Sequence, residues 1–124
     1  MANKVRPLNF IQVRKGSRLL VTVDHQSGSK YRLSATAYLD SVQKDSWSHS
    51  ELKDKTIRYA LTKVGNYTLP VYMTATGDDN NEVEVTANIE KPDGTKRPRS
   101  KSATLTAKKK KDAAMVLILV QVIA

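Results

Sequence analysis

The chain lacks cysteine, and several other residue types are scarce. None of its 124 residues is cysteine, so disulfide bonds, thiolate metal sites and cysteine nucleophiles are excluded together. Aromatic residues make up 6% of the chain, and its five glycines are scattered, so no glycine-rich loop is available to cradle a nucleotide phosphate. The length suits one hydrophobic core, and we expect a single domain over residues 1–124.

Long hydrophobic runs are also absent, with one partial exception. The charged N-terminus is not followed by an apolar run, so no secretory signal is predicted. We expect synthesis in the cytosol, and the final location, including a virion or export by another route, stays open. The exception is residues 113–124, which are too short for the ~20-residue helix that crosses a bilayer. Their β-branched side chains predict an apolar C-terminal strand instead.

Apolar and polar residues alternate with a period of two through most of the chain. The alternating segments are 18–24, 30–40, 57–62, 67–75 and 82–89. One dry face and one wet face are typical of antiparallel sheets stacked in two layers. The sequence therefore predicts an all-β fold, an antiparallel two-layer β-sandwich of about eight strands. Immunoglobulin-like, jelly-roll and C2-like topologies stay open.

Two places interrupt this alternation. Residues 40–55 predict a long connection with one helical turn, because Ser48 and Glu51 have the spacing of a capping box. Pro70 lies inside an alternating segment and has no N–H group to give to a neighbouring strand. Its strand is therefore predicted to be an edge strand at that point or to contain a bulge.

Residues 61–69, with the sequence LTKVGNYTL, resemble the tyrosine corner of immunoglobulin-like sandwiches. In that corner a tyrosine near the start of a strand hydrogen-bonds to the backbone a few residues upstream. The resemblance covers nine residues. It implies a sandwich in which Tyr67 bonds upstream, and it implies nothing about function.

Positive charge is concentrated in residues 91–111. This segment has nine cations against Asp93 alone, which is +8 of the net charge of +9. The cations are Lys91, Lys96, Arg97, Arg99, Lys101, Lys108, Lys109, Lys110 and Lys111. They predict a basic hairpin and arm at 91–111 that binds an anionic polymer, if both parts of the segment lie together.

Two further expectations concern this segment. It contains no aromatic side chain for base stacking, so contacts would be made to the polymer backbone. Arg97 and Arg99 are both expected to be exposed, so their charge reversal should abolish binding and leave folding intact. The alternative is that these lysines and arginines only keep sheet edges soluble.

The sequence gives little support for catalysis. His25 and His49 have no partner at a metal-ligand spacing, and no nucleophile elbow is present. The Asp78–Glu82 turn could offer oxygen ligands to calcium, but it departs from the EF-hand spacing, and a polar hairpin tip is the ordinary explanation. We expect no enzyme activity, cofactor, metal or small-molecule substrate.

These observations favour a non-enzymatic structural or assembly module that self-associates and binds nucleic acid, as a phage or viral structural protein would. The first alternative is a membrane-active or lipid-surface module, C2-like or toxin-like, in which lysines 108–111 meet anionic headgroups. The second is an adhesion or carbohydrate-binding domain whose interface would use Trp47, Tyr38 and Tyr72.

Overall fold

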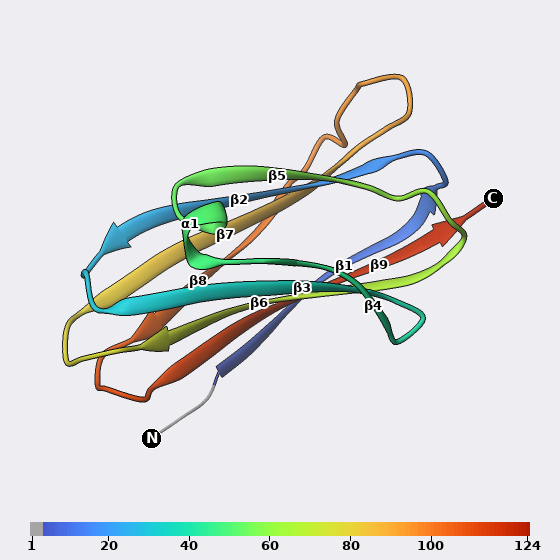
Figure 1. The fold of residues 1–124 in the computed structure, drawn as a ribbon. Helices are drawn as coiled ribbons and strands as arrows, with labels where there is room; N and C mark the ends of the chain where they lie inside the picture. The colour runs from blue at the N-terminus through green and yellow to red at the C-terminus, as the bar shows by residue number, and fades with distance from the viewer. Residues whose placement is uncertain (1–3) are drawn as a thin grey trace.

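A computed structural model describes residues 4–124 as two β-sheets that pack face to face (Figure 1). The elements are β1 (Lys4–Arg14), β2 (Arg18–Ser27), β3 (Tyr31–Leu39), β4 (Val42–Trp47), α1 (His49–Leu52), β5 (Lys55–Ala60), β6 (Gly65–Ala75), β7 (Asn81–Glu90), β8 (Lys101–Ala107) and β9 (Ala113–Ile123).

Five strands form sheet A, in the order β1-β9-β6-β3-β4, and four form sheet B, in the order β5-β2-β7-β8. Neighbouring strands run antiparallel except β1 and β9, which are parallel. The predicted two-layer antiparallel sandwich is confirmed, with nine strands in the described chain rather than about eight. The additional strand is β4, in the segment predicted as a connection. It is an edge strand whose side chains are mostly exposed, so it lacks the alternation that reveals a half-buried strand.

The corner at the start of β6 has the hydrogen bond that the resemblance implies. The hydroxyl oxygen of Tyr67 accepts a hydrogen bond of 3.2 Å from the backbone N–H of Lys63. The strand order is nevertheless not that of an immunoglobulin domain. Strands β6 and β9 pair, yet β7 and β8 of the other sheet come between them in the chain. In an immunoglobulin sandwich the corresponding F and G strands are consecutive.

Pro70 lies in the central strand β6, so the prediction of an edge strand or a bulge there is wrong. Strand β6 has β9 on one side and β3 on the other. The ladder with β3 omits the pairs between Ala35–Val71 and Tyr38–Thr68, and the same register continues beyond the gap. The missing N–H of Pro70 is thus accommodated by a local interruption of the ladder instead of a change of register.

The core lies between the two sheets and contains one cluster of buried side chains. Alternate residues of β7 and β9 face into it, so the apolar C-terminal strand lies in the centre of sheet A, between β1 and β6. The helical turn α1 begins after Ser48, and the predicted capping box with Glu51 is present. Burial of its Leu52 holds this turn against the core.

The strand directions define two ends of the sandwich (Figure 1). Loops 15–17, 40–41, 61–64 and 91–100 lie at one end, which we call the 91–100 end. Loops 28–30, 48–54, 76–80 and 108–112 lie at the other, which we call the 108–112 end.

Candidate polyanion-binding surface

The structure divides the predicted basic arm into two separate clusters. Residues 91–100 form the loop before β8, residues 101–107 are β8 itself, and residues 108–112 form the turn after it. Seven strand residues at about 3.3 Å each place the clusters some 20 Å apart, at opposite ends of the sandwich (Figure 1). The condition that both parts of the segment lie together is therefore not met.

The loop 91–100 begins with a tight turn that uses its only acidic side chain. The backbone N–H of Lys91 donates to Thr95 O at 2.7 Å, and that of Gly94 donates to Lys91 O at 2.9 Å. The carboxylate of Asp93 accepts hydrogen bonds from the hydroxyl of Thr95 at 2.7 Å and from its N–H at 2.9 Å. These bonds hold the pKa of Asp93 below its ordinary value. Asp93 thus fixes the turn that displays Lys91 and Lys96.

Arg97 connects this loop to the opposite sheet. Its guanidinium donates hydrogen bonds of 3.0 Å to the carbonyl oxygen of Ile11 and 3.2 Å to that of Gln12, both at the bulge in β1. Its backbone N–H donates to Ile89 O at 3.0 Å, and its carbonyl accepts from the side chain of Asn88. Arg97 is half-buried, so the prediction that it is a freely exposed cation is wrong. The reason is that β1 and β8 are edge strands of the two sheets and contact each other, so the bulge in β1 lies within reach of the loop before β8.

Two arginines from sheet B share one carboxylate beside this loop. Glu90 Oε1 accepts a hydrogen bond of 2.8 Å from Arg18, and it also accepts one from Arg58. The bond from Arg58, supported by the charge of Arg18, lowers the pKa of Glu90. A single β-bridge pairs Glu90 with Lys96. Two arginine cations therefore contact one buried carboxylate, and the group retains a positive charge.

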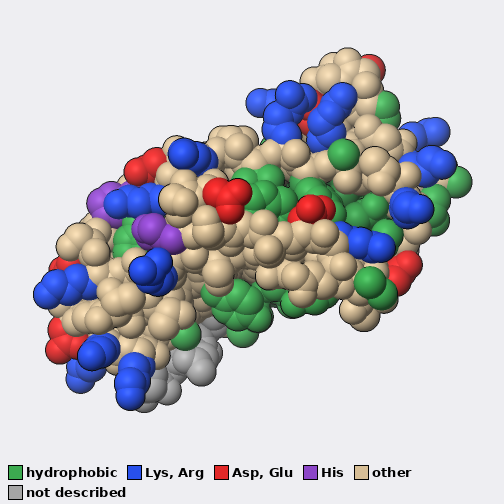
Figure 2. Space-filling view, in the orientation of Figure 1, with side chains coloured by type: hydrophobic (Ala, Val, Ile, Leu, Met, Phe, Trp, Pro, Cys, Tyr) green, Lys and Arg blue, Asp and Glu red, His purple; other side chains and the backbone are tan. Residues whose placement is uncertain are grey.

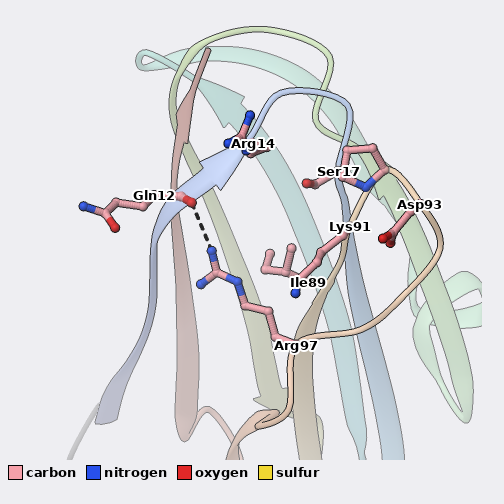
Figure 3. Close-up of a pocket in the computed structure, with 8 residues that line it drawn as sticks. Gln12, Arg14, Ser17, Ile89, Lys91, Asp93 and Arg97 are labelled. Atoms are coloured by element: carbon pink, nitrogen blue, oxygen red, sulfur yellow. Dashed lines mark hydrogen bonds between the residues drawn. The ribbon is translucent and has the colours of Figure 1, made fainter.

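A cavity of about 470 Å³ opens between the loop and the end of β1 (Figure 3). Its lining includes the cations Arg14, Lys91 and Arg97, together with Gln12 and Ser17. Figure 3 shows the Arg97 guanidinium pointing toward the backbone of Gln12, with Arg14 at the end of β1 above it. Basic side chains from β1 and from the 91–100 loop thus face the same space, although they are far apart in the sequence.

Charge is distributed very unevenly between the two ends. Segments 14–18, 40–41, 58–64 and 90–101 reach the 91–100 end and contain ten cations and three anions, a net charge of +7. Segments 4–6, 24–32, 48–55, 76–84 and 108–112 reach the other end and contain ten cations and eight anions, a net charge of +2. Figure 2 shows the difference: Lys and Arg cluster over the protruding loop, whereas acidic and basic side chains mix at the opposite end.

The lysine turn 108–111 is surrounded by carboxylates. Asp112 accepts hydrogen bonds from the backbone N–H groups of Lys108 and Lys109, at 3.3 and 3.1 Å. Asp78 accepts one of 2.9 Å from the N–H of Lys110. The four lysine side chains are exposed, but the carboxylates that shape the turn lie among them and weaken its positive potential.

The remaining predicted cations lie at the 91–100 end. Lys91, Lys96 and Arg99 are exposed. Lys101 lies over the ring of Phe10, with its Nζ 5.4 Å from the ring centroid. Sequence reasoning missed Arg14, Lys15, Arg18, Arg58 and Lys63, which join this end from other strands and loops. Only the sheet register brings them together, and no local pattern in the sequence indicates it.

The three aromatic residues predicted as an interface do not form one surface. Trp47 pairs with the buried Ala35 and is half-buried, in edge-to-face contact with Tyr59 at 5.5 Å. Tyr38 and Tyr72 lie on the outer face of sheet A, where Tyr72 is 43% exposed. Trp47 therefore belongs with the core layer and the two tyrosines with a different, outward face.

Both histidines lie beside Tyr31 at the 108–112 end. His25 stacks on the Tyr31 ring, and its Nε2–H donates to Gly28 O at 2.6 Å. His49 contacts the same ring edge-on, and its Nδ1 accepts a hydrogen bond of 3.0 Å from the N–H of Leu33. Within residues 4–124, no group of three or more His, Asp or Glu side chains could hold a metal ion. No helix in the described part of the chain is long and apolar enough to cross a membrane.

Comparison of the chain with known protein families, with curated proteins and with solved structures gives no match in any of the three. The function proposed below therefore rests on the charges and contacts of this chain.

Proposed function

We propose that the protein is a non-enzymatic binding module whose 91–100 end holds the phosphate backbone of a nucleic acid. The observation that supports this is the net charge of +7 on segments that converge at one end, against +2 at the other. A cation cluster of this kind releases condensed counterions from a nucleic acid, which gives sequence-independent and strongly salt-dependent binding.

Lys91, Lys96 and Arg99 are the side chains best placed to contact phosphates. All three are exposed and extend from a loop whose turn is fixed by Asp93 and whose base is fixed by Arg97. Lys91 also faces the cavity that Arg14 lines, so one phosphate could be contacted from both sides. Arg97 and Lys101 have positioning roles, because both are engaged with β1.

The alternatives have less support. A lipid-inserting module would need apolar residues beside lysines 108–111 that can leave the fold, but β9 is paired on both sides in the centre of sheet A. A carbohydrate-binding surface would need Trp47 beside Tyr38 and Tyr72, and Trp47 packs against the core instead. A role in a phage or viral particle stays a prediction, since it requires assembly as well as nucleic-acid binding.

The experiment measures the affinity of the purified, nuclease-treated protein for a fluorescent single-stranded RNA and for duplex DNA over a range of salt concentrations. Replacing Lys91, Lys96 and Arg99 together by Glu should weaken binding at least tenfold and reduce the slope of log K against log salt by about 2–3. The matched control replaces Lys108, Lys109 and Lys110 by Glu, which changes the net charge equally.

The control should keep most of the affinity, because its lysines lie among carboxylates at the less basic end. Equal losses in the two variants would mean that only the total charge matters and would contradict the proposed site. Wild-type protein that binds anionic vesicles but neither nucleic acid would instead support the lipid alternative.

A further inference from the structure

We infer that the outer face of sheet A is an interface between two copies of this chain. The face is the side of β1, β9, β6 and β3 that points away from sheet B, and it is separate from the basic end. The three central rows across the four strands are Val5, Met115, Tyr72 and Ser34; Pro7, Leu117, Pro70 and Thr36; and Asn9, Leu119, Thr68 and Tyr38.

The centre of this face is apolar and carries no charge, and Arg32, at the start of β3, lies on the same side beyond the Ser34 row. None of the twelve residues in the three central rows is ionisable at neutral pH, and six of them are Val, Met, Leu or Pro. Val5 is 52% exposed and Tyr72 43% exposed. In Figure 2 hydrophobic side chains reach the lower margin of the molecule, on the side of sheet A in Figure 1. The outer face of sheet B differs, with Thr22, Thr56 and Thr86 beside Arg58 and Glu90. Contiguous exposed apolar patches of this kind mark interaction sites.

The net positive charge of the chain favours a second copy as the partner that covers this face. The chain has a net charge of +9, so two copies repel one another wherever their cations meet. The centre of the outer face of sheet A is the place where they can touch without bringing like charges together. It offers nothing to a phosphate backbone and provides no charge for an acidic or basic partner to pair with. A second uncharged apolar face is its best complement, and the chain itself supplies one.

The size of the face fits a stable dimer. Strands β1, β6 and β9 have 11 residues each, or about 36 Å, and four strands spaced at about 4.8 Å are about 19 Å wide. The whole outer side of the four strands, which includes Arg32 and the strand ends, has a projected area of about 700 Å², close to the ~800 Å² that each partner buries in an interface of standard size. Two such faces can pack as aligned sheets, as β-sandwich layers do.

The raised and hollow parts of the face match a two-fold axis through the Leu117 row. This axis lies in the plane of the interface and is perpendicular to the strands. A hollow of about 310 Å³ lies at the Leu119 row, lined by Asn9, Thr68 and Leu119. The exposed side chains of Val5 and Tyr72 lie two residues away from the Leu117 row in the other direction. The axis therefore places Val5 and Tyr72 of each copy against the hollow of the other. It also puts the two 91–100 ends, each at +7, at opposite ends of the dimer.

The first test is the mass in solution of nuclease-treated protein by light scattering, at several concentrations and at high salt. Wild-type protein should have twice the chain mass of 13.8 kDa. Leu117→Lys should raise the dimer dissociation constant at least about 100-fold, since it places two cations at the axis. The control is Val64→Lys, which changes an apolar side chain 53% exposed in a loop outside the face and should remain dimeric.

Tyr72→Lys is the second variant in case Leu117→Lys does not fold, because Tyr72 is already largely exposed. A thiol at the axis gives an independent readout, since the chain has no other cysteine. Leu117→Cys should form a disulfide-linked dimer on mild oxidation, whereas Val64→Cys should not. Monomeric wild-type protein at all concentrations would overturn the inference, as would a dimer that both lysine variants leave intact. Nucleic-acid binding by monomeric Leu117→Lys separates this inference from the proposed function.

Discussion

Arg97 and Ile11 are 86 residues apart in the chain, yet the guanidinium of one donates a hydrogen bond of 3.0 Å to the backbone carbonyl of the other. The contact joins the loop after β7, in sheet B, to the bulge of β1, in sheet A. It bridges the two sheets at the edge formed by β1 and β8, next to the cavity that Lys91 and Arg14 line. The basic end therefore owes part of its shape to one of its own cations.

Arg97→Ala should lower the free energy of unfolding by about 1–2 kcal/mol, because it removes charged hydrogen bonds to two carbonyl groups. Arg99→Ala removes the same charge from a fully exposed position and should change stability by less than about 0.5 kcal/mol. Urea denaturation followed by circular dichroism measures both. Equal effects of the two substitutions would show that the contact with β1 adds nothing to stability.

Asn81 should be the most sensitive polar position of the fold. It is fully buried, and its side-chain amide bonds to the N–H and carbonyl of Lys30 and to the carbonyl of Ala107. Asn81→Ala leaves the Lys30 N–H without this partner and removes the two bonds that its amide donates, although the Lys30 carbonyl still accepts from Thr76, so it should cost about 1–3 kcal/mol. Asn80→Ala, at the exposed tip of the same turn, is the control and should be nearly neutral in thermal unfolding. A small loss at Asn81 would mean that water replaces its amide.

His49 should make the fold sensitive to mild acid. Burial, and then the charges of Lys53 and Arg32, lower its pKa below the ordinary value of 6.5. The unfolded chain therefore takes up a proton at a higher pH than the folded chain. Stability falls as the pH drops from 6.5 toward the pKa of the folded state. Protonation also removes the acceptor for the Leu33 N–H.

The comparison is the unfolding free energy of wild type and of His49→Gln, measured between about pH 7 and about pH 5. Gln retains an acceptor oxygen but does not titrate, so the variant should lose less stability over this interval. The two proteins differ only at position 49, so the difference between their pH profiles isolates His49. Parallel pH profiles would contradict the assignment.

Local pattern was sufficient for much of the fold. The alternation in residues 30–40 and 82–89 predicted β3 and β7, and the spacing of Ser48 and Glu51 predicted the capped turn α1. Strand β4 escaped prediction because an exposed edge strand needs no apolar alternation. The prediction of an edge strand or a bulge at Pro70 was wrong because a central ladder can omit pairs without a change of register. Whether it can do so depends on the neighbouring strand.

For the candidate site, the sequence determined which residues are charged and that Lys91, Lys96 and Arg97 belong to one loop. It also determined that the C-terminal residues are a strand, because period and side-chain type are local properties. Only the tertiary structure decided that lysines 108–111 lie at the other end among Asp78 and Asp112, and that Arg14, Arg18 and Arg58 join the loop. Which charges meet depends on strand order and register, and these arise from packing between segments far apart in the chain.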